Sequence, residues 1–108
     1  MEAAQKLKFN NSITMLLNHA AGDSGGSKRC AMFLLSLWSG DEFKADLQEF
    51  LYNDAEVFSS MIFILQYLYD TNSQLDSFVS GERMKPVIHT WGAVFRQNPR
   101  VKDFHGPA

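Results

Sequence analysis

The chain has 108 residues, enough for one modest hydrophobic core and too few for a second domain of ordinary size. Hydrophobic residues make up 45% and aromatic residues 13%, a composition that excludes global disorder. A formal net charge of −2 argues against broad binding of duplex DNA, which usually needs a basic face. The single cysteine, Cys30, excludes an intrachain disulfide and, beside an apolar run, indicates a reduced core residue in an intracellular protein.

Segments for export or membrane insertion are not evident. The longest apolar stretch, residues 61–68, is interrupted by Gln66 and is much shorter than a bilayer span. Residues 1–8 lack the continuous apolar run of a secretory signal. We therefore expect a cytoplasmic protein that makes no membrane contact.

Helical periodicity runs through nearly the whole chain, without a convincing alternation of strand type. The predicted fold class is all-α, a compact bundle of four to five helices in a single domain over residues 11–98. Residues 1–10 are expected to form a flexible N-terminal segment and residues 99–108 a flexible C-terminal tail.

The first predicted helix begins with Asn11 or Ser12 as its cap. Apolar residues then follow at the spacing i, i+3, i+4 and i+7 of a half-buried helix, and they are Ile13, Leu16, Leu17 and Ala20. Gly22 is expected to end this helix in a left-handed conformation, with residues 23–27 as the turn.

That turn reads GDSGG from Gly22, which resembles the nucleophile motif of chymotrypsin-like serine proteases. The chemistry of that motif needs a histidine oriented by a carboxylate, and in that family both residues lie far upstream of the serine. Here only His19 precedes it, almost adjacent, and 108 residues cannot form the two β-barrels of the fold. A helix-to-helix turn is the better interpretation, and we expect no catalytic residue.

The second helix is expected to begin at Ser24 or Ser27, to end before Gly40 and to be central, because its apolar face is broad. Ser27, Lys28 and Arg29 at its start form a candidate anion site, since helix N-termini expose N–H groups. Cations in a first helical turn oppose the helix dipole, so another contact should compensate them. The alternative is a surface pair that faces Asp23, Asp41 or Glu42, and the spacing is not that of a P-loop.

Residues 41–53 fit either a short helix capped by Asp41 or an irregular segment that packs two or three apolar side chains. The apolar candidates are Phe43, Leu47, Phe50 and Leu51. Carboxylates cluster in and just after this segment, and they are Asp41, Glu42, Asp46, Glu49, Asp54 and Glu56. They are interpreted either as caps and solvent-facing charges or as an acidic face that binds a partner.

The strongest predicted helix follows Asp54, a good N-cap, and ends near Tyr69. One expected face consists of Phe58, Met61, Ile62, Leu65 and Tyr69, and other apolar residues cover most of the remainder. Such a helix is either buried on several sides or partly reserved for a partner, and homodimerisation through it is one option.

Residues 70–81 are expected to form a polar turn followed by a linker or a short helical turn. The last helix runs from Glu82 or Met84 to Gln97, with Pro86 in its first turn, where proline is tolerated. The three histidines are scattered along the chain, so no metal and no cofactor are expected.

Three stretches carry a family resemblance, and they are GDSGGSKRCAMFLLSLWSGDEF from Gly22, ADLQEFLYNDAEVFSSMIFIL from Ala45 and GERMKPVIHTW from Gly81. Together they resemble a family of small uncharacterised helical proteins carried by bacterial plasmids, integrative elements and phages, over roughly residues 14–95. Pro86 departs from the pattern. The resemblance implies no activity, but it implies the setting of a mobile-element accessory protein.

This setting leads to two functional hypotheses. The first is a non-enzymatic protein-interaction module that binds a host protein or protein complex, acting as an anti-defence, anti-CRISPR-like inhibitor through the acidic face. The second is a small nucleotide- or nucleic-acid-binding regulator that uses the helix start at Ser27, Lys28 and Arg29. Direct contact with nucleic acid is the less favoured of the two.

Overall fold

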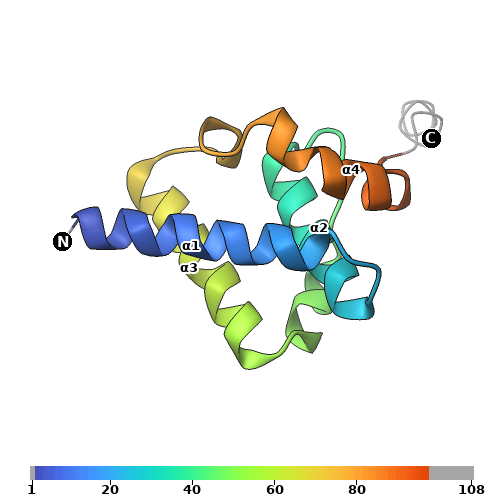
Figure 1. Cartoon of the computed structure of the whole chain (residues 1–108), viewed down its shortest axis with the longest axis horizontal. Coiled ribbons are helices and arrows are strands. Elements are labelled where there is room, and N and C mark those ends of the chain that lie inside the picture. The colour runs from blue at the N-terminus through green and yellow to red at the C-terminus, as the bar shows by residue number, and fades with distance from the viewer. Residues whose placement is uncertain (1, 98–108) are drawn as a thin grey trace, which may run out of the picture.

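Helices account for most of residues 2–97, the part of the chain that the computed structural model describes, apart from the side chain of Glu2. They are α1 (Glu2–Ala20), α2 (Gly25–Trp38), the 3₁₀ helix η1 (Leu47–Tyr52), α3 (Ala55–Thr71), the 3₁₀ helix η2 (Leu75–Ser77) and α4 (Gly81–Phe95). α1 lies along the long axis of the molecule and packs on α2, α3 and α4 (Figure 1). No strand occurs within these residues, so the prediction of a compact all-α domain is confirmed.

The N-terminal boundary of the helical domain was predicted wrongly. α1 already begins at Glu2, so residues 2–10 are helical rather than a flexible segment, and neither Asn11 nor Ser12 is a helix cap. The polar run Asn10-Asn11-Ser12 resembles a helix start in sequence, yet it lies within one continuous helix. The predicted tail, residues 99–108, lies outside the described residues.

Phe9 explains why α1 extends so far. Its side chain is completely buried. It stacks on Tyr67 of α3 with ring centroids 4.3 Å apart and meets Phe78 edge to face at 5.1 Å. The buried stripe of α1 therefore begins one turn earlier than expected and includes Phe9, Ile13, Leu16 and Ala20.

The turn after α1 depends on Gly22, although not for the predicted reason. Within residues 2–97 no glycine has a positive φ, so the expected left-handed conformation was wrong. A Cβ at Gly22 would instead lie 2.7 Å from the Ser27 hydroxyl oxygen, so a side chain there would force Ser27 to shift. The Trp91 Nε1–H donates to the carbonyls of Ala20 and Gly22, each at 3.1 Å, and satisfies acceptors at the end of α1.

α2 is the central helix, as predicted. It packs against α1, α4, η1 and η2, and residues 30–35 are all buried. Ser24 is its N-cap, because the Ser24 hydroxyl accepts a hydrogen bond from the Ser27 backbone N–H at 3.1 Å. Cys30 is a free, buried core residue, and its burial, followed by the nearby Asp54 charge, raises its thiol pKa to about 11.

α3 begins as predicted but buries a different face. Asp54 caps it by accepting from the Val57 N–H at 2.9 Å. The buried face consists of Val57, Met61, Ile64 and Leu68. Ile62, Leu65 and Tyr69 of the predicted face are exposed, because a helix that is apolar nearly all round shows no preferred face until it is packed.

α4 starts earlier than predicted, so Pro86 lies beyond the first turn. Ser80 caps the helix by accepting from the Arg83 N–H at 3.3 Å, and Gly81 is the first helical residue. Pro86 is then the sixth residue, and its missing N–H removes one intrahelical bond, to the Glu82 carbonyl. Both positions are exposed, where water can replace that bond.

No helix among the described residues combines the length and the apolar character needed to cross a bilayer.

Candidate functional site

The start of α2 does not bring the three candidate anion ligands onto one surface. The Ser27 side chain is buried, and its hydroxyl lies 3.0 Å from that of Ser24. Lys28 is exposed to solvent. Arg29 is half-buried and turns toward η1. Successive residues of an α-helix point about 100° apart, so the three side chains leave the helix in different directions.

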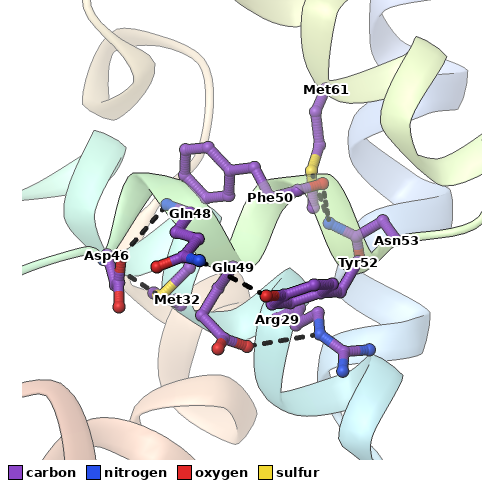
Figure 2. A network of polar contacts seen from close by, with 9 residues as sticks. All are labelled: Arg29, Met32, Asp46, Gln48, Glu49, Phe50, Tyr52, Asn53 and Met61. Carbon is purple, nitrogen blue, oxygen red and sulfur yellow. Dashed lines mark hydrogen bonds and ion pairs between the residues drawn. The ribbon is translucent and has the colours of Figure 1, made fainter.

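Arg29, the fifth residue of α2, makes the compensating contact that was expected of a cation near a helix start. Its Nε lies 3.4 Å from Oε1 of Glu49, and its guanidinium carbon lies 5.8 Å from the centroid of the Tyr52 ring (Figure 2). The carboxylate and the ring face both favour a cation. Arg29 is therefore part of a surface charge pair, but its partner is Glu49 and none of the three carboxylates expected from the sequence.

Two of the six candidate partner-binding carboxylates are helix caps. Asp46, and not Asp41, caps η1, where it accepts from the Gln48 N–H at 3.0 Å. Asp54 caps α3. Each carboxylate satisfies an N–H group that a helix start leaves unpaired, so removing it affects folding as well as surface charge.

Two more of these carboxylates form intramolecular ion pairs. Glu49 pairs with Arg29, and Glu42 pairs with Arg96 at 3.0 Å. Asp41 and Glu56 are exposed, and within residues 2–97 neither makes a side-chain hydrogen bond or ion pair. The six carboxylates are therefore not one free acidic face, because four of them already have intramolecular partners.

η1 is short, but it is fixed to both neighbouring helices, as Figure 2 shows. The Asp46 backbone N–H lies 3.4 Å from the sulfur of Met32 in α2, and Phe50 meets Phe33 of α2 edge to face at 5.6 Å. The Asn53 side-chain amide donates to the Phe50 carbonyl at 3.2 Å and lies 3.5 Å from the sulfur of Met61 in α3. The outward-facing side chains of η1 are therefore held at a defined position on the surface.

Those outer side chains are apolar, and they include Leu47 and Leu51, two of the four apolar candidates for packing in this segment. Leu47 is 74% exposed and Leu51 71%, and the neighbouring Tyr52 is also exposed. We call these three residues the η1 tip. Phe43 and Phe50 supply the packing of this region, since Phe43 is fully buried and Phe50 half-buried.

A second exposed apolar surface lies on α3, and the sequence pattern did not reveal it as exposed. Ile62, Leu65 and Tyr69 recur at i, i+3 and i+7, so they share one side of the helix, and Tyr69 is 82% exposed. We call these three residues the α3 stripe. The spacing is visible in the sequence, which left open whether this face is buried or reserved for a partner.

The α3 stripe borders a cleft of about 670 Å³ between the C-terminal ends of α2 and α3. Residues 36–41 form one side, and the other side includes Leu65, Leu68 and Tyr69 together with residues 72–76. Leu65 and Tyr69 thus belong both to the α3 stripe and to the wall of the cleft. We call it the α2–α3 cleft.

The described part of the chain contains no evident metal site. Within residues 2–97, no group of three or more His, Cys, Asp or Glu side chains is arranged to hold a metal ion.

The fold and its surfaces define a class: a small all-α domain with a buried central helix, paired surface charges and exposed apolar side chains on η1 and α3. The chain belongs to DUF7673, a family of unknown function whose model matches residues 10–92. The matched range contains α2, η1, α3 and η2 entire, with most of α1 and α4. No curated protein and no solved structure matches the chain.

Proposed function

We propose that this protein is a non-enzymatic interaction module of the cytoplasm that binds a host protein or protein complex. The η1 tip is the observation that carries the proposal. Leu47 and Leu51 are large, apolar and exposed, and η1 is anchored to α2 and α3 through polar and aromatic contacts. Clustered exposed apolar side chains mark interaction surfaces, Tyr52 is of a type enriched at interface hot spots, and a fixed backbone loses little conformational entropy on binding.

The finer proposal concerns the biological setting. The sequence resemblance supports a protein carried by plasmids, integrative elements or phages. Small proteins from such elements commonly bind and block host components, so we propose an anti-defence, anti-CRISPR-like inhibitor. It would act by steric occlusion, with exposed carboxylates such as Asp41 and Glu56 at the edge of the contact.

The alternative function, a nucleotide- or nucleic-acid-binding regulator, has less geometric support. Ser27 is buried against Ser24, and Arg29 is paired with Glu49. Lys28 would have to bind the phosphate without them, unless Arg29 leaves its partner. A single exposed lysine contributes one screened charge and no bidentate geometry.

The experiment is affinity purification of tagged full-length protein from its native host, followed by quantitative mass spectrometry. Leu47→Glu with Leu51→Glu places charge on the η1 tip, and Leu7→Glu is the matched control. Leu7 lies on α1 and is 62% exposed, so its replacement is equally mild for folding. Circular dichroism establishes that all variants are folded.

We expect one host protein to be enriched by the wild type and by the Leu7 variant, and lost from the doubly substituted variant. Recovery of nucleic acid alone would contradict the proposal and favour the regulator. Equal recovery by all three proteins would show that the η1 tip is not the contact.

A further inference from the structure

Charge is distributed very unevenly along this chain. Residues 45–82 contain seven carboxylates and no Lys, Arg or His, whereas the remaining residues carry an excess of basic groups. The seven are Asp46, Glu49, Asp54, Glu56, Asp70, Asp76 and Glu82. This range contains η1, α3 and η2, so the acidic segment and the exposed apolar side chains of η1 and α3 coincide.

The α2–α3 cleft is the place where this acidic character is combined with a hollow. Asp41 and Asp76 are among the described residues that line it, and no Lys, Arg or His is among them. Lys44 lies at the rim, where its ammonium donates to the carbonyl of Gly40, a lining residue, at 3.1 Å, and it makes no ion pair with Asp41 or Asp76. A cation entering the cleft would therefore meet two exposed acceptors.

Backbone carbonyl groups around the cleft carry partial negative charge, which adds to the charge of the carboxylates that line it. α2 ends at Trp38 and α3 ends at Thr71, and the C-terminal ends of both helices border the cleft. Helix C-termini carry partial negative charge from their last carbonyl groups, which favours a cation there. Trp38 and Tyr69 add aromatic rings, and ring faces attract guanidinium and ammonium groups.

The α3 stripe supplies the apolar half of the same surface. Leu65 and Tyr69 line the cleft, and Ile62 continues the row by about one turn along α3. The stripe is a ridge on a helix, and ridges of this kind pack against a second helix. Since residues 2–97 contain no strand, they offer no sheet edge to which an extended peptide could add.

We propose that the α3 stripe and the α2–α3 cleft together bind a basic amphipathic helix of the partner protein. This inference rests on the proposed function and names the partner's chemistry. The apolar face of the partner helix lies on Ile62, Leu65 and Tyr69, and a Lys or Arg side chain from its flank enters the cleft beside Asp41 and Asp76. A second copy of α3 is a poor occupant, because packing two α3 stripes together would bring two acidic segments into contact.

The test uses the full chain and three labelled synthetic peptides of about 18 residues, long enough to be helical. One carries Leu at i, i+3, i+4 and i+7 with Lys elsewhere, the second replaces Lys with Glu, and the third scrambles the first. Fluorescence anisotropy measures the Kd of each. We expect the Leu/Lys helix to bind more tightly than either of the others by about tenfold or more, a difference of about 1.4 kcal/mol.

Variants of the protein locate the binding site. Ile62→Ala with Tyr69→Ala should weaken binding of the Leu/Lys peptide about tenfold, and Asp41→Asn with Asp76→Asn several-fold. Leu7→Ala, an exposed leucine on α1, should leave the Kd unchanged. The same affinity for all three peptides, or no loss in the α3-stripe variant, would overturn the inference.

Two further results separate this inference from its premise and from self-association. If the host protein is captured through the η1 tip but the Leu/Lys peptide does not bind, the proposed function stands and the inference falls. If light scattering finds a dimer that Ile62→Ala with Tyr69→Ala dissociates, the α3 stripe is covered by a second copy and the inference is wrong.

Discussion

The two apolar faces of α3 have nearly the same side-chain chemistry and opposite environments. Met61, Ile64 and Leu68 are buried in the core, whereas Ile62, Leu65 and Tyr69 are exposed on the adjacent side of the same helix, about 100° around its axis. α1 packs on α3, and the cleft lies between the ends of α2 and α3. The difference shows that apolar character alone does not assign a helix face to the core, because the neighbouring elements decide which face is covered.

The contact between α1 and α3 supports the largest predicted effect. Phe9→Ala should lower the free energy of unfolding by about 3–5 kcal/mol, because a completely buried ring is removed from its stack with Tyr67 and Phe78. Urea denaturation measures the loss. Leu7→Ala, on the same helix but exposed, should cost less than about 0.5 kcal/mol. Similarly small losses for both would place residues 2–10 outside the cooperative core.

The comparison of the two α3 faces can be tested with one matched pair of isoleucines. Ile64→Ala should cost about 2–5 kcal/mol, because Ile64 has no exposed surface. Ile62→Ala should cost less than about 1 kcal/mol, because Ile62 is already 48% exposed. Thermal unfolding of both variants decides the matter, and equal destabilisation would mean that the α3 stripe is covered in the isolated protein.

The smallest expected effect concerns the ion pair that fixes η1 to α2. Both side chains of the Arg29–Glu49 pair are partly exposed, so a double-mutant cycle should give a coupling of about 0.2–1 kcal/mol. A coupling near zero would show that the aromatic and sulfur contacts hold η1 without it.

The two cations at the start of α2, Lys28 and Arg29, test the alternative function through phosphate binding. We expect the Lys28→Ala and Arg29→Ala variants to have the same affinity for inorganic phosphate as the wild type, measured by isothermal titration calorimetry. The reason is that the three candidate ligands point in different directions. If both substitutions abolish phosphate binding, the anion site exists and the regulator becomes the better proposal.

Much of the fold could be predicted from the sequence because its signals are local. Asp54 as a cap and the broad apolar face of α2 follow from propensities within a few residues. Phe9 could not be placed in that way, because the rings that bury it come from residues 67 and 78. The polar residues that follow it in sequence therefore had the pattern of a helix start.

The candidate site was harder to predict than the fold. The cluster of six carboxylates was visible in the sequence, but the caps at Asp46 and Asp54 and the pairs of Glu42 and Glu49 depend on partners that local pattern identifies only in part. Arg96, the partner of Glu42, lies at the far end of α4. Which charges remain free for a partner is therefore a property of the packed chain.

The sequence by itself determined the helical class, the single domain, most turns and the acidic composition of residues 45–82, because these depend on residue type and short-range spacing. Only the tertiary structure decided which face of α3 is buried, that Leu47 and Leu51 face solvent, and that the ends of α2 and α3 enclose a cleft. The reason is physical: exposure is set by contacts between distant segments, and apolar side chains alike in sequence differ once α1 has covered one of them and not another.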